Sequence, residues 1–295
     1  MNKILITGAN GNLGGTLVKE LADHSSFGVV AVASEKKKVF DMLEREQVEN
    51  RESVYAVSSD DFLRGEWTDD GIFAAVHMAF SRANRSSRDI AASLDYSRRV
   101  YHRLHEMKAP RVIYISSQSV YGTTSEWRTE ATPVSPEIVY SMAKYAGEKL
   151  LETEFSETGA LFSVLRLDYV IQSQRLVSAL CQQARTTGVL SLKGGKQVFS
   201  YIDKTDAAKA IVALLQYDGE WRHVYNVGPD RMRLSLVEIA EVVKQVAEKH
   251  GYKGVDIQLE ATDTELWSGM DSSLFTRDTG WQPSMDIYRM VEGFF

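Results

Sequence analysis

Residues Thr7 to Gly14 read TGANGNLG and directly follow the apolar run Ile4-Leu5-Ile6. This pattern predicts a short buried strand, a glycine-rich turn and the first turn of a helix, which suits the pyrophosphate of a dinucleotide. We expect Gly8 to permit the tight turn, Gly11 to let the backbone approach the phosphates, and Gly14 to let the helix pack close to the strand.

The helix expected over Leu13–Leu21 adds to this site. Its first backbone N–H groups have no partner within the helix and would face the phosphate charge. The candidate cofactor-binding residues of the turn are therefore Gly8, Asn10, Gly11, Asn12, Leu13 and Gly14.

The bulk composition is that of an ordinary globular protein. The 295 residues, 44% apolar and 25% charged, suffice for one large or two modest domains. The net charge of −6 makes neither nucleic acid nor an anionic membrane an expected partner. His102 and His105 stand three residues apart without a further ligand motif, so no metal site is expected.

Cysteine content and hydropathy bear on the compartment. Cys181 is the only cysteine, which excludes an internal disulfide, fits a reducing compartment and is more typical of a core residue than of a nucleophile. No apolar stretch approaches the ~18 residues of a membrane span. The chain starts with a predicted strand and not with a signal peptide, so we expect a cytoplasmic protein.

Apolar strands and amphipathic helices alternate through residues 1–167. The expected strands are Lys3–Thr7, Val29–Ala33, Val54–Val57, Ala74–Met78, Val112–Ser116 and Phe162–Leu167. The expected helices are Leu13–Asp23, Lys36–Glu46, Ser86–Met107 and Tyr140–Thr153. Strands that are apolar on both faces and separated by helices predict an α/β fold, a doubly wound parallel sheet of the Rossmann type.

Residues 168–295 are expected to form a smaller mixed α/β substrate-binding domain over the carboxyl edge of the sheet, with returns to the first domain near 197–227. A loop is expected over Gly188–Gly195. The other expected elements are helices Arg175–Thr186, Thr205–Leu215 and Leu236–His250, and strands Gln197–Ile202 and His223–Val227.

Tyr140 and Lys144, in the segment YSMAK, stand four residues apart at the start of a predicted helix. Positions i and i+4 share a helix face, so the phenol and the ammonium point into the same space. A cation beside a phenol favours the phenolate and would lower the pKa of Tyr140 from about 10 toward neutrality. The pair alone is a weak signal.

The segment SSQSVYG, residues 116–122, directly follows the strand expected over Val112–Ser116. Its hydroxyls should emerge at the same sheet edge as the glycine turn. Ser117, 23 residues before Tyr140, is placed to hydrogen-bond both the phenol and a substrate oxygen; a serine-rich turn is the alternative.

Together these motifs resemble the extended short-chain dehydrogenase/reductase family, and most closely its nucleotide-sugar epimerases, dehydratases and reductases. The resemblance covers nearly the whole chain. Its further matches are Val120-Tyr121-Gly122, Glu130 with Pro133 and Pro136, Tyr201-Ile202 with Asp206-Ala207, Tyr225-Asn226-Val227-Gly228, Leu236-Val237-Glu238 and Thr279-Gly280-Trp281-Gln282-Pro283.

The resemblance implies a role for each of three residues. Tyr140 would be the acid/base that exchanges the alcohol proton while hydride moves to or from nicotinamide. Lys144 would lower the pKa of Tyr140 and bind the nicotinamide ribose. Ser117 would hold and polarise the reacting oxygen.

The resemblance also implies residues around the two ligands. Asp60 or Asp61 would contact the adenine, and both could equally be a solvated pair. The strand end Met78-Ala79-Phe80 would line the cofactor. The implied substrate-binding residues are Ser119, Arg166, Asp168 and Tyr201.

Several positions depart from the family pattern. Gln118-Ser119 stand where dehydratases carry Asp-Glu, which disfavours dehydration, and Phe80 stands where a glycine is usual. Asp168 replaces an asparagine and Ser200 an arginine, which weakens the case for a sugar diphosphate unless Arg166, Arg175 or Lys193 compensates.

The end of the second strand bears on cofactor choice. NAD enzymes usually place a carboxylate there, whereas this chain has Ser34, then Glu35 and three lysines. Ser34 with Lys36 or Lys37 would suit the 2′-phosphate of NADP, and Glu35 could instead act as the NAD-type acid. We expect NADP, with NAD as the alternative.

These residues favour a C4 epimerase or 4-keto reductase of a nucleotide sugar. One alternative is a reductase of a smaller hydroxy-carbonyl compound, and another is a non-catalytic NADP-binding sensor, which Phe80 motivates. By resemblance, a homodimer through helices 86–107 and 140–153 is expected. The apolar stripe of Tyr96, Val100 and Leu104 would suit that interface or the protein's own sheet.

Overall fold

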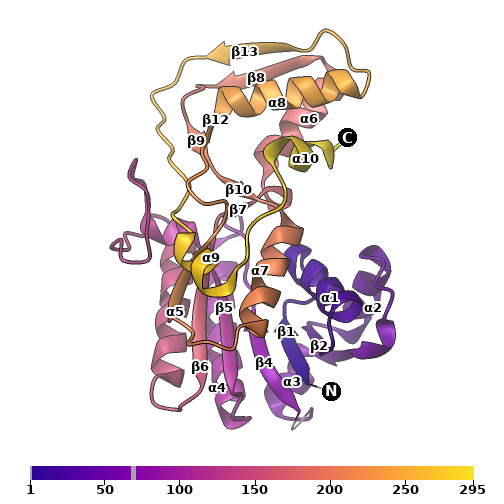
Figure 1. Ribbon diagram of the computed structural model, residues 1–295, viewed down its shortest axis with the longest axis vertical. Helices are drawn as coiled ribbons and strands as arrows, with labels where there is room; N and C mark the ends of the chain where they lie inside the picture. The colour runs from indigo at the N-terminus through magenta and orange to yellow at the C-terminus, as the bar shows by residue number, and fades with distance from the viewer. Residues whose placement is uncertain (1, 68–70) are drawn as a thin grey trace.

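The computed structural model describes residues 2–67 and 71–295, and they form two lobes (Figure 1). The larger lobe contains a seven-stranded sheet in the order β11-β6-β5-β4-β1-β2-β3. Every neighbouring pair in this sheet is parallel. Its strands are β1 (Lys3–Thr7), β2 (Gly28–Ala33), β3 (Val54–Ser58), β4 (Ile72–His77), β5 (Arg111–Ser117), β6 (Leu161–Leu167) and β11 (Val224–Val227).

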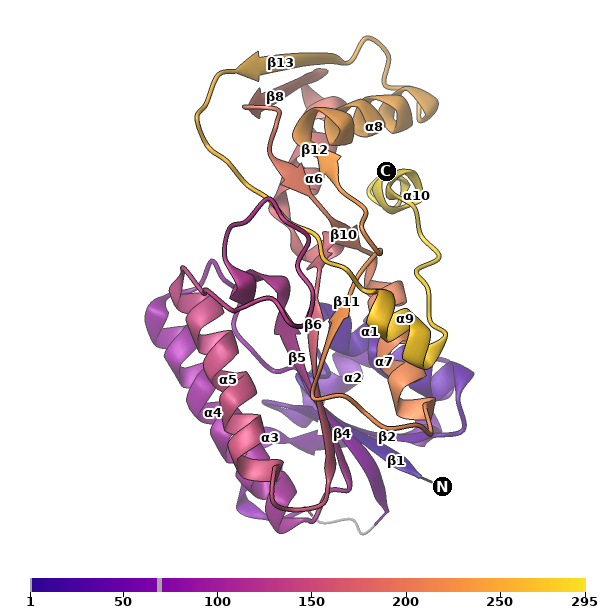
Figure 2. The same cartoon turned by 60° about the vertical axis from the view of Figure 1, so that its left-hand side comes forward.

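Helices cover both faces of this sheet, as Figure 2 shows. Ile4 and Ile6 of β1 belong to the core shared with α1 (Asn12–His24), α2 (Lys36–Arg45) and α7 (Lys204–Gln216). Leu5, between them, belongs to the core shared with α3 (Ser59–Arg64), α4 (Ser87–Glu106) and α5 (Val139–Phe155). Successive side chains of a strand point to opposite faces, so each strand contributes to both cores. The expected doubly wound sheet is confirmed.

The structure contains all six strands and all four helices expected in residues 1–167, with ends that move by no more than two residues. It adds α3, a helix of six residues that begins where the Ser58 hydroxyl accepts from the N–H of Asp61. A helix this short shows no hydrophobic period in the sequence. Asp60 and Asp61 therefore lie in the first turn of a helix.

The smaller lobe has its own apolar core, which includes Cys181. Its elements are α6 (Arg175–Thr186), β8 (Val189–Lys193), α8 (Leu236–Lys249), β13 (Asp256–Glu260) and α10 (Ile287–Glu292). The loop expected over Gly188–Gly195 is wrong, because β8 pairs there with β13. Leu190 and Leu192 are buried while Ser191 and Lys193 are exposed, which is the alternation of a half-buried strand.

The strand expected over Gln197–Ile202 is divided at Ser200. β9 (Val198–Phe199) pairs with β12 (Leu234–Ser235), and β10 (Tyr201–Ile202) pairs with β7 (Tyr169–Val170). The chain then returns to the larger lobe, where α7 packs on α1 and β11 pairs with β6. The short helix α9 (Ser273–Thr279) packs beside β11.

The apolar stripe on α4 faces its own sheet. Val100 and Leu104 are fully buried in the core of the sheet, and Tyr96 packs against that core while donating to the Ser59 hydroxyl at 3.1 Å. The stripe is therefore not a surface for a partner. Among the described helices, none combines the length and apolar character needed to cross a bilayer.

We expect Gly14→Ala to lower the free energy of unfolding by about 1–3 kcal/mol, the usual cost of overpacking. A Cβ at Gly14 would lie 2.2 Å from the carbonyl oxygen of Gly8, so backbone must move. At Gly15 a Cβ meets only side-chain atoms, at 3.0 Å or more, so Gly15→Ala is the matched control with little loss. Urea unfolding followed by circular dichroism measures the free energy of unfolding of both variants. Equal losses would contradict the conclusion that the close approach of Gly14 to Gly8 requires glycine.

Candidate active site

A cavity of about 600 Å³ opens at the carboxyl edge of the sheet. Its walls come from the ends of β1, β4, β5 and β6, from the first turns of α1 and α5, and from β7 and the segment after it. Among the residues that line it are Gly8, Gly11, Gly14, Phe80, Arg82, Ser117, Tyr140, Lys144, Asp168, Tyr169 and Arg175. Parallel α/β sheets bind ligands at this edge.

The glycine turn forms one wall of the cavity. Gly8 has φ +72°, and a Cβ there would lie 2.8 Å from the Cα of Ala79, so the turn packs directly on the end of β4. Asn12 and Leu13 also line the cavity, and the Asn12 amide donates to the Ser173 hydroxyl at 3.2 Å. Asn10 is not among the lining residues; its carbonyl accepts from Arg45 at 3.3 Å.

Ser117, Tyr140 and Lys144 all line this cavity. Ser117 ends β5, and the other two lie one turn apart at the start of α5. The Lys144 ammonium donates to the carbonyl oxygen of Ile115 at 2.8 Å, which ties α5 to β5. The structure thus brings the three expected catalytic side chains to one place.

The Lys144 ammonium is almost completely enclosed, with 4% of the residue exposed. Its Nζ lies 4.2 Å from the ring centroid of Phe80 and 4.9 Å from that of Tyr114. Burial lowers the pKa of Lys144 to about 7, and the negative charge of Glu148 opposes that shift. At neutral pH the amine is therefore held between its charged and neutral forms.

The pKa of Tyr140 moves opposite to the sequence expectation. Burial raises it to about 12, Tyr169 adds to the rise, and a hydrogen bond with Ser117 opposes it. The expectation that Lys144 lowers the pKa of Tyr140 is therefore wrong for the protein without a bound cofactor. Nζ lies 6.0 Å from the centroid of the Tyr140 ring, and desolvation of the phenolate outweighs a cation at that distance.

Arg166 does not line the cavity, so the expectation that it binds substrate is not supported. Its Nη2 donates to Glu148 Oε2 at 2.6 Å and its Nε to Oε1 at 3.1 Å, both groups being buried. Its guanidinium carbon lies 4.7 Å from the ring centroid of Tyr121. The Ser116 hydroxyl also donates to Glu148, so this network supports the site from behind.

The other expected substrate residues divide into two groups. Ser119 and Asp168 line the cavity, whereas Tyr201 does not. Tyr201 is 4% exposed and stacks on Phe199 with 5.8 Å between ring centroids, so it is a core residue of the lobe junction. The hydrogen bonds of Ser119 go to Ser117.

The expected cofactor residues after β2 and β3 lie outside this cavity and close to one another. Lys36 Nζ lies 3.0 Å from Asp61 Oδ2, whereas Asp60 is exposed and lies 3.9 Å from Arg64. The Ser34 hydroxyl accepts from Lys38 at 2.8 Å. Of the expected group 78–80, Met78 and Phe80 line the cavity while Ala79 supports the glycine turn.

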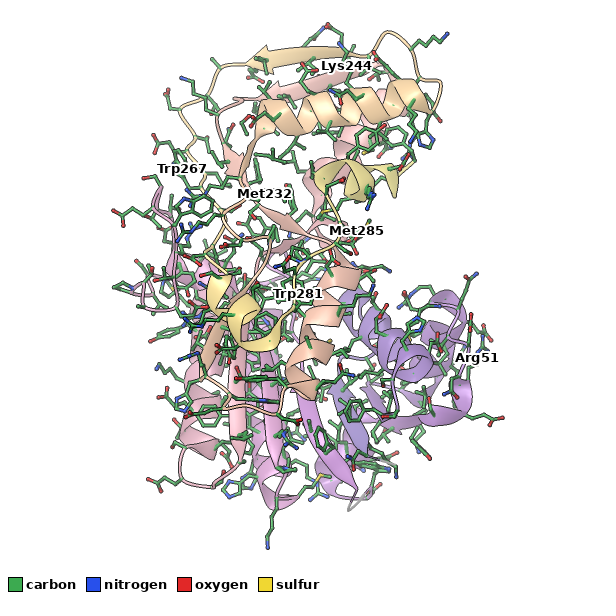
Figure 3. All side chains as sticks on the ribbon, viewed as in Figure 1. Arg51, Met232, Lys244, Trp267, Trp281 and Met285 are labelled. Carbon is green, nitrogen blue, oxygen red and sulfur yellow. The ribbon has the colours of Figure 1, made fainter. Side chains whose placement is uncertain are left out.

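Sequence reasoning missed several residues of the site. Tyr169 and Arg82 line the cavity, and Tyr169 lies close enough to Tyr140 to raise its pKa. Arg175, which the sequence offered as a compensating cation, also lines the cavity. Arg128 does not line the cavity; it is 2% exposed and donates to the carbonyls of residues 122, 267 and 269. Figure 3 shows Trp267 on the connection that follows β13. Of these residues, only Tyr169 could have been found from the sequence, because it stands two residues after the end of a predicted strand, at the edge where ligands bind.

Comparisons with known proteins agree with this fold. A family model described as "NAD dependent epimerase/dehydratase family" matches residues 4–228. A curated relative from Bacillus subtilis (strain 168), an uncharacterized UDP-glucose epimerase, is 22% identical over 289 residues and covers 92% of this chain and 90% of its own.

Solved structures of similar fold include both epimerases and a dehydratase. A mutant UDP-glucuronic acid 4-epimerase from Bacillus cereus, in complex with a fluorinated substrate analogue and NAD, has a TM-score of 0.83 at 18% identity and covers 98% of this chain and 96% of its own. An NAD-dependent NDP-hexosamine 5,6-dehydratase of tunicamycin biosynthesis has a TM-score of 0.78 at 20% identity, with 99% and 95% covered. At these identities the likeness shows the fold.

We expect Lys144→Met to raise the melting temperature near pH 7 by about 2–4 °C, the shift that ~1 kcal/mol gives a chain of this size. The buried amine has a pKa of about 7 against an ordinary 10.5, so the unfolded chain binds more protons between these values. This group therefore destabilises the fold at low pH, and its cost fades as pH rises from about 7 to 10.5.

Lys149→Met is the matched control, because Lys149 lies on the same helix with an exposed side chain. It should leave the melting temperature nearly unchanged. A lower melting temperature for Lys144→Met across this pH window would contradict the desolvation argument.

Proposed function

The chain belongs to the NAD dependent epimerase/dehydratase family, and from that premise we propose an NAD(P)-dependent oxidoreductase that transfers hydride at a hydroxyl or ketone of a nucleotide sugar. The reaction would be C4 epimerisation or 4-keto reduction. One observation carries the proposal: Ser117, Tyr140 and Lys144 line the same cavity as the glycine turn.

The glycine turn fits a dinucleotide. A Cβ at Gly11 would lie 3.1 Å from the Gly8 carbonyl oxygen, and one at Gly14 would collide with it, so neither position has room for a side chain. Bare backbone and a helix N-terminus suit a pyrophosphate. A bound nicotinamide would supply the hydride acceptor or donor and, when oxidised, a positive charge.

The protein's own part in the proposed chemistry is to move a proton and hold the substrate oxygen. Ser117 would donate to that oxygen, and Tyr140 would take or return its proton. Because burial raises the pKa of Tyr140 to about 12, the phenolate needs positive charge nearby. Lys144 supplies part of that charge when it is protonated, which its pKa of about 7 places near neutral pH.

Gln118 supports the preference against dehydration. Its Oε1 accepts from the N–H of Gly269 at 3.0 Å and from Arg128 at 3.3 Å, and the residue is 2% exposed. It neither lines the cavity nor carries a carboxylate. Cofactor that stays bound through purification would favour the epimerase, which recycles it, and free exchange would favour the reductase.

A reductase of a smaller hydroxy-carbonyl compound is the second candidate. Two observations favour it: a carboxylate, Asp168, lies on the cavity wall, and Arg166 is paired with Glu148 and so is not available to a diphosphate. Arg82 and Arg175, both exposed and both on the wall, favour a diphosphate instead. Competition by UDP, dTDP and GDP separates the two, because a protein that binds none of them has no nucleotide-sugar site.

NADP is the cofactor that we propose, with NAD as the alternative. Ser34, Lys36 and Lys38 gather at the carboxyl end of β2, and the carboxylates that pair with the two lysines belong to partly exposed ion pairs. Exposed ion pairs are weak because water and salt screen them, so a 2′-phosphate could replace the carboxylate partner of Lys36.

A homodimer through α4 and α5 remains a proposal. Its support is an exposed apolar group at the start of α5, formed by Ile138, Val139 and Met142, each about half exposed. Sedimentation equilibrium tests it, and a monomer at micromolar concentration would refute it.

We expect Tyr140→Phe to lower kcat by about 10²–10⁴-fold, the usual contribution of a positioned acid/base. Cofactor affinity should stay nearly unchanged, because the aromatic ring is kept and only the hydroxyl is removed. Tyr145→Phe on the same helix is the control and should keep kcat. Turnover of Tyr140→Phe at the wild-type rate would remove the mechanism.

We expect Lys36→Gln to weaken NADP binding about tenfold, as the loss of one charge-assisted contact implies, and to leave NAD binding unchanged. Lys249→Gln in the smaller lobe is the control for net charge. Isothermal titration with both cofactors measures the effect. Equal affinity of the wild-type protein for NAD and NADP would contradict the proposed preference for NADP.

A further inference from the structure

Three aromatic rings surround the ammonium of Lys144. Its Nζ lies 4.2 Å from the ring centroid of Phe80, 4.9 Å from that of Tyr114 and 6.0 Å from that of Tyr140. A cation within about 6 Å of a ring centroid is attracted by the negative face of the ring. The three rings therefore form an aromatic cage around a charge that is withdrawn from water.

Phe80 is the ring of this cage that the proposed chemistry does not yet explain. Tyr114 is fully buried in the core of the sheet, and Tyr140 is the proposed acid/base. Phe80 lines the cavity, and its ring meets the ring of Tyr140 in a T-shaped pair, with 6.1 Å between centroids and 81° between planes. One apolar side chain thus lies against both members of the Tyr140–Lys144 pair.

The backbone on both sides of Phe80 is held in place. A Cβ at Gly8 would lie 2.8 Å from the Cα of Ala79, so the glycine turn packs directly on the residue before Phe80. The N–H of Ser81 donates to the Ser93 hydroxyl at 3.0 Å, which ties the residue after Phe80 to α4. The ring is therefore presented to Lys144 from a fixed point of the chain.

The cage stabilises the cation without occupying its hydrogen-bond donors. An ammonium has three N–H donors. Within the described part of the chain, Lys144 bonds the Ile115 carbonyl and forms no ion pair. Glu148, whose charge favours the protonated amine, is itself bonded to Arg166 and Ser116. A carboxylate in contact with Lys144 would take up these donors and would repel an anionic cofactor, whereas a ring face does neither.

We propose that Phe80 is a positioning residue, which acts on the proposed reaction through Lys144. Its ring holds the protonated ammonium beside Tyr140 and favours the charged form, while N–H donors remain for a hydroxyl of the ligand. This inference rests on the proposed function. It gives a role within that function to the residue that motivated the alternative of a non-catalytic sensor.

Lys144 is the group of the cage that titrates near neutral pH. The titratable groups that face it from β4, β5 and α5 are His77, Tyr114, Tyr140 and Glu148. Burial lowers the pKa of His77 to about 3 and raises the pKa of Tyr140 to about 12 and that of Tyr114 well above its usual value. Glu148 is paired with Arg166. A change of charge in the cage between about pH 5 and pH 9 therefore belongs to Lys144.

The test is the protonation midpoint of Lys144, followed by NMR on protein with ¹³C-labelled lysine side chains. Lys144→Met identifies the resonance. We expect the wild-type midpoint at the pKa of about 7. In Phe80→Leu it should fall by about one pH unit, because leucine keeps the apolar volume but offers the cation no negative face. Phe80→Tyr keeps the ring face and should keep the midpoint.

Phe155→Leu is the matched control. Phe155 is the last residue of α5, at the end of the helix away from the cavity, and is 1% exposed. This variant loses a buried ring, so its free energy of unfolding should fall while the midpoint of Lys144 stays at the wild-type value. Phe80→Met also removes the ring face and tests the inference where Phe80→Leu does not fold.

The same shift should appear in turnover, measured with UDP-glucose as the probe substrate. Protonated Lys144 supports the phenolate of Tyr140, so kcat should fall as Lys144 loses its proton. The pH of that fall should move down with the midpoint in Phe80→Leu and return to the wild-type value in Phe80→Tyr. An unmoved midpoint in Phe80→Leu would overturn the inference, and so would a moved midpoint with a wild-type pH profile of kcat.

Either of these failures leaves the proposed function standing if Tyr140→Phe loses turnover. Turnover of Tyr140→Phe at the wild-type rate would remove the proposed function, and with it the role of Phe80, whatever the titration shows. The titration needs neither substrate nor cofactor, so the two failures are distinguishable.

Discussion

The enclosed ammonium of Lys144 is the constraint on which the site depends. Its hydrogen bond to the Ile115 carbonyl joins the first turns of α5 to the end of β5. This contact places Tyr140 and Ser117 on one cavity, and it does so at the cost of burying a charge. The lowered pKa of Lys144 is the measure of that cost, so the residue that organises the site also weakens the fold at neutral pH.

A second buried charge pair supports the first. Glu148, one turn after Lys144, accepts from Arg166 and from Ser116. Its negative charge favours the protonated form of Lys144, so the pair acts on a side chain of the cavity without lining the cavity itself. The sequence motif suggested that Arg166 binds substrate, but its pairing with Glu148 makes it a structural residue. Removing one partner of such a pair leaves an uncompensated buried charge.

The cavity takes its character from both lobes. The glycine turn, Ser117 and Lys144 belong to the parallel sheet and its helices, while Ser200, between β9 and β10, holds the carboxylate of Asp168. The amide of Asn12 donates to the Ser173 hydroxyl, and both residues line the cavity. The expected catalytic residues thus lie on the sheet and its helices, and Ser200 and Asp168 lie where the two lobes meet.

The sequence alone determined the order of strands and helices in residues 1–167, the glycine turn, and the gathering of Ser117, Tyr140 and Lys144 at one sheet edge. These follow from local periodicity, backbone requirements of glycine and the geometry of parallel strands. Only the tertiary structure decided that Arg166 and Tyr201 are buried, that β8 is a strand, and that the pKa of Tyr140 rises. Desolvation and ion pairing depend on contacts between segments that are far apart in the chain. Local sequence patterns do not show which of these segments will pack together.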